Sequence, residues 1–301
     1  MIRKRTFYMI LLWIVAGVSL SLRAEEAGGF IRQEPAASIA SAAVAEASGL
    51  AVSSRDAGFM WIVNDSGAQA DLHLFGTDGV DHGQVRVEGA VNADWEDLSS
   101  FELDGKSYLL IADTGDNASR REDCVLYVVE EPALPGAGEK LSGTVKVAWK
   151  IPFRFEDGPR DCESVAVDAR VGKIILVSKR TKPPVVYEMP LRPKDGPVVA
   201  KRLTETTVAP PKGVPMLPYI AQPTGMDLAR DGSMGVLVSY YGVFLFPRSG
   251  KESWGEAFAK PPVILSPHGM AQAESVAFSM DGKTLTLVSE RGDKRIVEYR
   301  R

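Results

Sequence analysis

A short pattern that recurs five times constrains the fold of this chain more than any other feature. Its first part reads EASGLAV from Glu46, DWEDLSS from Asp94, DCESVAV from Asp161, QPTGMDL from Gln222 and QAESVAF from Gln272. A β-rich run follows each copy and ends in WIVND, LLIADT, ILVSKR, VLVSYY or LTLVSER. Equivalent positions in the two parts lie 14 to 16 residues apart in all five copies. Recurrence at a nearly fixed spacing indicates a repeat architecture.

Each copy extends into further predicted strands. Third strands are LHLF from Leu72, CVLYVV from Cys124, VVYEM from Val185, VFLF from Val243 and IVEY from Ile296. Fourth strands follow the first four copies, as GQVRVEG, TVKVAWKI, VAKRLTE and PPVILS. The fifth copy reaches Arg301 without one, and residues 30–33 (FIRQ) supply a matching strand near the other end. Radial repetition of four-stranded sheets is a β-propeller.

We therefore predict an all-β fold, a five-bladed β-propeller closed by an N-terminal strand, as one domain over residues 25–301. The alternative is a six-bladed propeller, with a degenerate blade hidden between Leu191 and Ile220; Pro210, Pro211, Pro215 and Pro218 in that stretch favour a loop. An ordinary β-sandwich is the other alternative, but a sandwich need not repeat its strands in groups of four.

Residues 1–24 are typical of a signal peptide. Arg3, Lys4 and Arg5 precede an almost wholly apolar stretch, residues 7–22, and a polar segment follows. We expect cleavage and a secreted or periplasmic monomer that is not an integral membrane protein; an uncleaved anchor is the alternative. Without residues 1–24 the chain has 31 basic and 39 acidic residues, a net charge near −8. This charge argues against nucleic acid as a partner, because phosphate binding needs a basic surface.

The repeat also places acidic side chains together. Since side chains two apart on a strand share a face, the first strands form one column of Glu46, Asp94, Asp161, Gln222 and Gln272, and a second of Ser48, Glu96, Glu163, Thr224 and Glu274. The ends of the second strands meet the same rim of the predicted channel. They add Asn64, Asp65, Asp113, Asp116, Asn117, Lys179, Arg180, Tyr240, Glu290 and Arg291.

Carboxylates gathered in this way repel one another and raise each other's pKa values, and three ways of offsetting the repulsion stay open. The first is a bound Ca²⁺, which takes six to eight oxygen ligands. Its predicted ligands are Asn64, Glu96, Asp116, Asn117, Glu163 and Glu274. The second is pairing with Arg120, Lys179, Arg180 or Arg291, and the third is hydration in an open channel. No contiguous EF-hand loop is present.

Individual roles follow from these positions. We assign Glu163 and Glu274 as catalytic bases if the protein is an enzyme. The predicted ligand-binding residues are Asp65, Asp94, Asp97, Asp113, Arg120, Asp161, Lys179, Arg180, Tyr240 and Glu290. Trp95 is predicted to pack between blades rather than to stack on a ligand. Cys124 and Cys162 map near the same rim, and the sequence leaves open whether they form a disulfide or stay buried thiols.

The motifs NDSG from Asn64, DWEDL from Asp94, DTGDN from Asp113, DCES from Asp161 and AES from Ala273 resemble those of a widespread family of secreted bacterial propeller-like proteins. The resemblance covers residues 46–300 and implies the fold and export, without an activity. More distantly, the chain is similar to lactonase- and phytase-esterase-like propellers. It departs from them in lacking a His dyad and the phytase type of acidic motif, so their activity is a fold-level analogy.

Three functions remain as hypotheses. The first is an exported propeller that binds an unknown small molecule, with Ca²⁺ as its cofactor, at the acidic mouth of the channel. The second is a metal-dependent hydrolase of a small ester, lactone or phosphate. The third is an interaction module that binds a protein or glycan component of the cell envelope.

Overall fold

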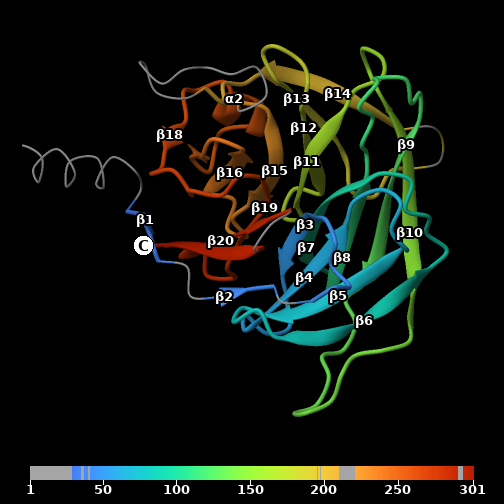
Figure 1. Cartoon of the computed structure of the whole chain (residues 1–301). Coiled ribbons are helices and arrows are strands. Elements are labelled where there is room, and N and C mark those ends of the chain that lie inside the picture. Colours follow the sequence, from blue (N-terminus) through green and yellow to red (C-terminus); the bar gives the residue numbers. More distant parts are fainter. Residues whose placement is uncertain are drawn as a thin grey trace, which may run out of the picture.

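The computed structural model describes residues 29–34, 37–39, 41–194, 196, 198–209, 221–290 and 294–301, and these residues form an all-β structure with one short helix (Figure 1). The predicted signal peptide lies outside the described residues, as do residues 210–220 of the stretch considered for a sixth blade, and Arg291. Among the described residues, none of the helical segments has the length and apolar character needed to span a membrane.

The strands follow one another in five antiparallel groups, here called modules 1 to 5. Module 1 consists of β3 (Ala47–Val52), β4 (Phe59–Asn64), β5 (Asp71–Gly76) and β6 (Asp81–Glu88). Module 2 consists of β7 (Trp95–Leu103), β8 (Lys106–Asp113), β9 (Cys124–Glu130) and β10 (Thr144–Phe155). Module 3 consists of β11 (Cys162–Asp168), β12 (Lys173–Ser178), β13 (Val185–Pro190) and β14 (Val198–Glu205). Module 4 consists of β15 (Pro223–Leu228), β16 (Met234–Ser239), β17 (Val243–Pro247) and β18 (Val263–Ile264). These groups match the strands predicted from the repeat.

Module 5 combines segments from both ends of the chain. It contains β19 (Ala273–Phe278), β20 (Thr284–Ser289) and β21 (Arg295–Arg300). Two short strands, β1 (Ile31–Arg32) and β2 (Ala37–Ser38), pair with β21 in antiparallel fashion. The predicted N-terminal strand therefore lies beside the last strand of the chain.

The first strands of the modules form the inner ring of the molecule. β3 contacts β7, and the contacts continue through β11, β15 and β19 back to β3. The strands approach closely: a Cβ atom on Gly49 would lie 2.7 Å from the backbone of Asp97, and one on Gly225 would lie 2.8 Å from the carbonyl oxygen of Glu274. Glycine is needed at both positions because a side chain would collide with the neighbouring strand.

The hydrophobic core is divided into five clusters, each between two neighbouring modules. Trp95, fully buried, packs between modules 1 and 2, and its indole N–H donates to the carbonyl of Val91 at 2.9 Å. The prediction that Trp95 is a packing residue is therefore confirmed. An all-β ring of sheets with its core between the sheets is consistent with the predicted β-propeller.

The outer strands contain a feature that the repeat did not predict. β10 is twelve residues long, and its two ends pair in parallel with β6 of module 1 and β14 of module 3. Modules 1 to 3 thus share one continuous sheet. Pairing of these outer strands protects edges that would otherwise be open to another chain.

The short helix α2 (Trp254–Phe258) was also not predicted. A capping box between Ser253 and Glu256 begins it, and this S-x-x-E pattern is visible in the sequence. Its buried residues Trp254 and Phe258 extend the core between modules 3 and 4.

Candidate functional site

A β-bulge interrupts every first strand at the same place. The register with the second strand shifts between Ala47 and Gly49, Trp95 and Asp97, Cys162 and Val165, Pro223 and Gly225, and Ala273 and Ser275. The inserted positions contain Ser48, Glu96, Glu163, Thr224 and Glu274, which is the second column predicted from the sequence. Bulges re-aim side chains and are common beside functional sites.

The side chains at these bulges play two roles. Ser48 donates a hydrogen bond to the carbonyl of Trp95 at 2.8 Å, and Thr224 donates one to that of Ala273 at 2.7 Å, so both connect neighbouring modules. Glu96, Glu163 and Glu274 are buried and instead contribute carboxylates to a cluster at this end of the ring. Three of the five modules therefore supply an acid where the others supply a hydroxyl.

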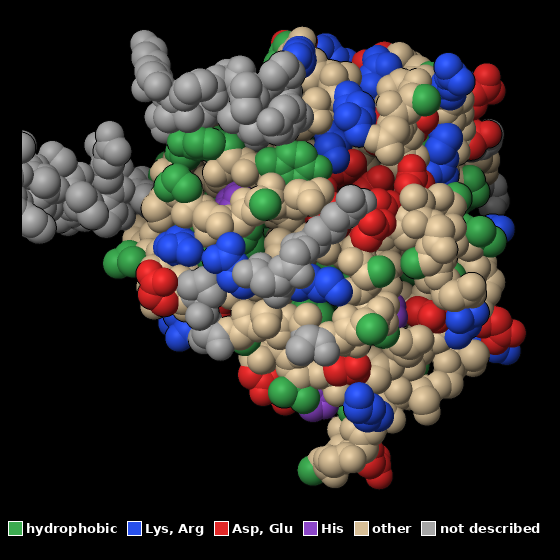
Figure 2. Space-filling model, in the orientation of Figure 1, with side chains coloured by type: hydrophobic (Ala, Val, Ile, Leu, Met, Phe, Trp, Pro, Cys, Tyr) green, Lys and Arg blue, Asp and Glu red, His purple; other side chains and the backbone are tan. Residues whose placement is uncertain are grey.

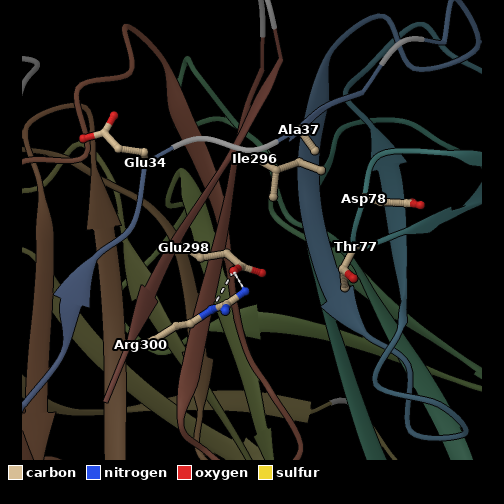
Figure 3. A pocket seen from close by; sticks show the side chains of 7 residues that line it. All are labelled: Glu34, Ala37, Thr77, Asp78, Ile296, Glu298 and Arg300. Atoms are coloured by element: carbon tan, nitrogen blue, oxygen red, sulfur yellow. Dashed lines mark hydrogen bonds and ion pairs between the residues drawn. The ribbon is translucent and has the colours of Figure 1, made fainter.

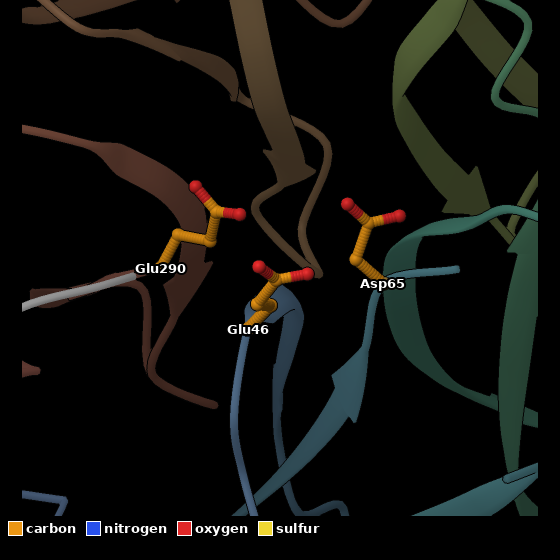
Figure 4. A group of neighbouring side chains, drawn as sticks. All are labelled: Glu46, Asp65 and Glu290. Atoms are coloured by element: carbon orange, nitrogen blue, oxygen red, sulfur yellow. The ribbon is translucent and has the colours of Figure 1, made fainter. Parts of the chain in front are cut away.

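We call this cluster the acidic mouth. It comprises Glu46, Asp65, Asp94, Glu96, Asp161, Glu163, Glu274 and Glu290. Figure 2 shows acidic side chains gathered near the middle of one face, with basic side chains close by. In three overlapping groups, one carboxylate oxygen from each residue lies within 4.8 Å of the others: Glu46–Asp65–Glu290, Asp65–Asp94–Glu96 and Glu96–Asp161–Glu163. Figure 4 shows the first group facing a common space.

Basic side chains from module 3 neutralise one side of the mouth. Lys179 is buried and forms an ion pair with Glu163, and its ammonium group lies 5.5 Å from the centre of the Tyr240 ring. The Tyr240 hydroxyl donates to Glu274. Arg180 forms an ion pair with Asp161, with a distance of 2.6 Å between Nε and Oδ2. Two of the three carboxylates of the third group, Asp161 and Glu163, are thus already paired with protein cations.

The middle group, Asp65–Asp94–Glu96, has a different environment. Among the described residues, no Lys or Arg lies within ion-pair distance of these three carboxylates. The Glu96 side chain also accepts no hydrogen bond from the described part of the chain, although Glu96 is only 6% exposed. A buried carboxylate without a donor is costly unless something else neutralises it.

The backbone of the DTGDN loop lies directly against this group. A Cβ atom on Gly115 would overlap Glu96 Oε1 and the carboxylate of Asp94. The Gly115 amide donates to the carbonyl of Asp94 at 3.1 Å, which fixes the loop there. Because Gly115 has no side chain, the two carboxylates can occupy the space beside it.

The carboxyls of the acidic mouth have raised pKa values. Burial, together with repulsion from Asp65, raises the pKa of Asp94 to about 6. Burial also raises the pKa of Glu96 well above its usual range, with added repulsion from Glu163, Asp65 and Asp94. The pKa of Glu274 is raised mainly by burial. Burial raises the pKa of Glu163 as well, against the opposing effect of Lys179.

Lys179 stays charged in this environment. Burial by itself would lower the pKa of Lys179, but Glu163, Glu274 and Glu96 together outweigh that effect and raise it. A charged Lys179 is an electrostatic partner rather than a free nucleophile, because only a neutral amine attacks an electrophile.

The rest of the DTGDN loop is held by Arg121, which the sequence analysis missed in favour of Arg120. Arg121 pairs with Asp113 at 2.8 Å and donates to the carbonyl of Gly115 at 2.8 Å. Arg120 is exposed and has no partner in the described part of the chain. This loop has no periodic pattern that would distinguish the two arginines.

Two predicted metal ligands, Asp116 and Asn117, lie in this loop and form hydrogen bonds with neighbouring residues. Asp116 accepts the Arg121 amide at 2.7 Å, and its own amide donates to Asp161 at 2.9 Å. Asn117 is exposed and accepts a hydrogen bond from Arg180. Both residues border the mouth without joining the carboxylate groups.

Asn64 lies beside the mouth with its polar atoms already used. Its side-chain oxygen accepts the Glu46 amide at 3.1 Å, and its amide nitrogen contacts the carbonyl of Ala43 at 2.9 Å and His73 Nε2 at 3.1 Å. Asn64 therefore positions Glu46 and the start of β3.

Asp97 lies deeper, within the inner ring. Its carboxylate accepts the backbone amides of Leu98 and Val165 at 2.8 Å and of Met226 at 3.2 Å, which belong to three different modules. Burial raises the pKa of Asp97 well above its usual range, and these three donors oppose the shift. Asp97 thus joins modules 2, 3 and 4, and both of its carboxylate oxygens accept backbone amides.

The two cysteines, whose pairing the sequence left open, are free buried thiols. Burial raises the pKa of Cys124 to about 12 and that of Cys162 well above its usual range. Both belong to the core cluster between modules 2 and 3. As protonated thiols in an apolar cluster, they are poor nucleophiles and poor metal ligands.

A pocket of about 230 Å³ lies away from the mouth, where β2 and β21 meet the turn after β5 (Figure 3). Arg300 points across it and pairs with Glu298 of the same strand at 2.9 Å. The charged groups that line this pocket do not converge on one point, unlike those of the acidic mouth.

Comparisons with known proteins identify no family. No family model and no curated protein matches the sequence. Among solved structures, a gluconolactonase from Xanthomonas campestris is similar over 83% of this chain and 70% of its own, with 12% identity and a TM-score of 0.46. The structure of U3-55K is similar over 85% of this chain and 95% of its own, with 11% identity and a TM-score of 0.44. Both TM-scores are below 0.5, so neither likeness bears on the activity of this chain.

Proposed function

We propose that this protein is an exported five-bladed β-propeller, closed by its N-terminal strand, that binds a hard divalent cation of the Ca²⁺ type at the acidic mouth and holds a small ligand there. The ring of contacts among the first strands, the five intermodule core clusters and the pairing of β1 with β21 support the architecture. Residues 1–24 support export.

The observation that carries the cation proposal is the environment of Glu96. It is buried beside Asp65 and Asp94, and the described residues give it neither a basic partner nor a hydrogen-bond donor. Gly115 leaves room for the Glu96 and Asp94 carboxylates. Carboxylate oxygens are the ligands that Ca²⁺ prefers, and a bound cation removes the repulsion that raises their pKa values.

In this proposal Asp65, Asp94 and Glu96 hold the cation, and water or a ligand completes its shell. Other groups of the mouth already have partners: Asp161 and Glu163 are paired with Arg180 and Lys179. The cation supplies a positive centre that binds a carboxylate, hydroxyl or phosphate oxygen of the ligand. Proteins that meet millimolar Ca²⁺ outside the cell bind it with dissociation constants of about 10⁻⁴ to 10⁻³ M, and we expect an affinity in this range.

The proposal is tested by metal analysis of the purified protein together with melting curves in Ca²⁺, Mg²⁺ and EDTA. We expect Ca²⁺ to raise the melting temperature and EDTA to lower it. Glu96→Gln should abolish the Ca²⁺ effect, whereas Glu102→Gln, an exposed residue of the same strand, should keep it. A protein that holds no divalent cation and melts at the same temperature in EDTA would exclude the proposal.

A second candidate, a metal-dependent hydrolase of a small ester, lactone or phosphate, is favoured by the network around Lys179. Lys179 pairs with Glu163, and Tyr240 donates to Glu274 in the same space. Elevated carboxyl pKa values suit general acid–base catalysis near neutral pH. The test is turnover on a panel of these substrates with Ca²⁺ present. Turnover that Glu163→Gln abolishes, while Ca²⁺ binding persists, would establish the enzyme; no turnover on any substrate would leave the binding function alone.

A further inference from the structure

A second polar cavity lies at the opposite end of the inner ring from the acidic mouth. The far ends of β7, β11 and β15 line it, and its volume is about 280 Å³. Its charged residues are Glu102, Asp168, Arg170 and Arg230. These four side chains differ in how far their charges are already neutralised.

Arg170 and Asp168 neutralise each other. Arg170 Nη2 lies 2.8 Å from Asp168 Oδ2, and its Nε lies 3.1 Å from Oδ1. Asp168 also accepts the indole N–H of Trp254 at 2.9 Å, and the pKa of its carboxyl is lowered because these bonds outweigh its burial. This pair contributes little net charge to the cavity.

Arg230 is held by hydroxyl groups instead. Its Nη2 donates to Ser54 Oγ at 2.7 Å and to Ser100 Oγ at 3.1 Å, which belong to modules 1 and 2. The guanidinium of module 4 thus reaches across the end of the ring. Its Nε and Nη1 have no acceptor, and no carboxylate forms an ion pair with it, among the residues that the structure describes.

The nearby carboxylate of Asp227 does not supply that partner. Each Asp227 oxygen accepts a backbone amide at 2.8 Å, one from Leu228 and one from Phe278. Burial raises the pKa of Asp227 to about 7, and Arg230 exerts only a weaker opposing effect. Arg230 therefore keeps free donors and an uncompensated charge at the cavity.

We infer that this cavity is a binding site for a small molecule that carries a carboxylate or phosphate group. The Nε and Nη1 groups of the Arg230 guanidinium still offer N–H donors of a permanent cation, and hydrogen bonds from such donors to oxyanions are stronger than hydrogen bonds between neutral groups. The serine hydroxyls hold the guanidinium in place, so that less conformational freedom is lost on binding. Glu102 is exposed at the same cavity, and its charge opposes the anion.

The test uses calorimetric titration of the full chain, freed of metal, with inorganic phosphate and separately with acetate at constant ionic strength. We expect saturable binding of at least one of them, and the one that binds identifies the group. Arg230→Gln should weaken that binding by about tenfold or more, the loss expected for a charged hydrogen bond. Glu102→Gln should strengthen it. Arg202→Gln, an exposed arginine of β14, is the matched control and should change it less than about twofold.

Two results would overturn the inference: no saturable binding of either anion by the wild-type protein, or equal binding by wild type and Arg230→Gln. If Arg230→Gln does not fold, Ser100→Ala and Glu102→Gln provide the test, because they must change the affinity in opposite directions. The measurement needs no bound cation, so its outcome is independent of the Ca²⁺ proposal.

Discussion

Gly115 lies so close to Glu96 that a single added carbon on its Cα would overlap the Glu96 carboxylate. The two residues come from different parts of module 2, since Glu96 lies in the bulge of β7 and Gly115 lies in the loop after β8. The described part of the loop thus lies against the buried carboxylate without donating a hydrogen bond to it. This relationship makes Glu96 and its neighbours a space suited to a cation.

The first prediction concerns that space. Gly115→Ala should displace the carboxylates of Glu96 and Asp94 and weaken Ca²⁺ binding by about tenfold, because one misplaced ligand group forfeits roughly 1.4 kcal/mol or more. Calorimetric titration with Ca²⁺ measures the change. Gly250→Ala is the matched control, because a Cβ atom there meets open space. Equal affinities in the two variants would contradict the assigned site.

The second prediction is a pH dependence. Asp94, with a pKa near 6, and Glu96, with a raised pKa, must lose protons before they bind a cation. Ca²⁺ affinity should therefore rise as the pH rises from about 5 to 7, with protons released on binding. Titrations at pH 6 in two buffers of different ionisation enthalpy measure the release. An affinity that does not change with pH would contradict a site made of these carboxyls.

The metal-free protein should show the opposite trend in stability. A carboxyl whose pKa is raised by folding holds a proton that the unfolded chain has lost, so the free energy of unfolding falls as the pH rises from about 4 through 6. Saturating Ca²⁺ should remove most of this fall. Urea denaturation at several pH values, with and without Ca²⁺, measures both effects.

The third prediction concerns the buried pair of Lys179 and Glu163. Lys179→Met leaves a buried carboxylate without its partner and should lower the free energy of unfolding by about 3 to 5 kcal/mol. Adding Glu163→Gln should recover much of that loss, because the stranded charge is then gone. Urea denaturation of the wild type, the two single variants and the double variant gives the free energies of unfolding for a double-mutant cycle. A neutral effect of Lys179→Met would show that the pair adds nothing.

The fourth prediction tests the inner ring. Asp97→Ala removes the acceptor of three backbone amides in three modules and should cost at least about 3 kcal/mol. Asp97→Asn keeps one acceptor oxygen and should lose less. Asp123→Ala, at an exposed aspartate, should change the free energy of unfolding by less than about 0.5 kcal/mol. If Asp97→Ala is as stable as that control, Asp97 does not join the modules.

The strand groups could be predicted because the same pattern recurs in the sequence of each module. Small residues such as Gly49 and Gly225 recur where the inner strands nearly touch, and the alternating pattern that follows them marks each strand. The long β10 could not be predicted, because its parallel pairing with β6 and β14 depends on which outer strands become neighbours. No local pattern encodes that arrangement.

The mouth was predicted only in part, for a similar reason. The recurring acids predicted that Glu96, Glu163 and Glu274 share one end of the ring. That prediction used the alternation of side chains along a strand and did not include the bulges at which these three residues lie. The different tasks of Asp94 and Asp97 are not visible in the sequence, although both belong to the same DWEDL motif. Asp94 lies beside other carboxylates, whereas Asp97 accepts backbone amides. The bulge at Glu96 lies between the two residues.

The central claim is a divalent cation among Asp65, Asp94 and Glu96. The most direct measurement is anomalous scattering from crystals of the protein grown with Ca²⁺ and then soaked in Mn²⁺ as an oxygen-seeking substitute. We predict a peak within about 2 to 2.6 Å of oxygens of these three carboxylates, the range for such metal–oxygen bonds, and no peak in crystals of Glu96→Gln. Wild-type crystals with no peak at the mouth, or with one that persists in Glu96→Gln, would contradict the claim.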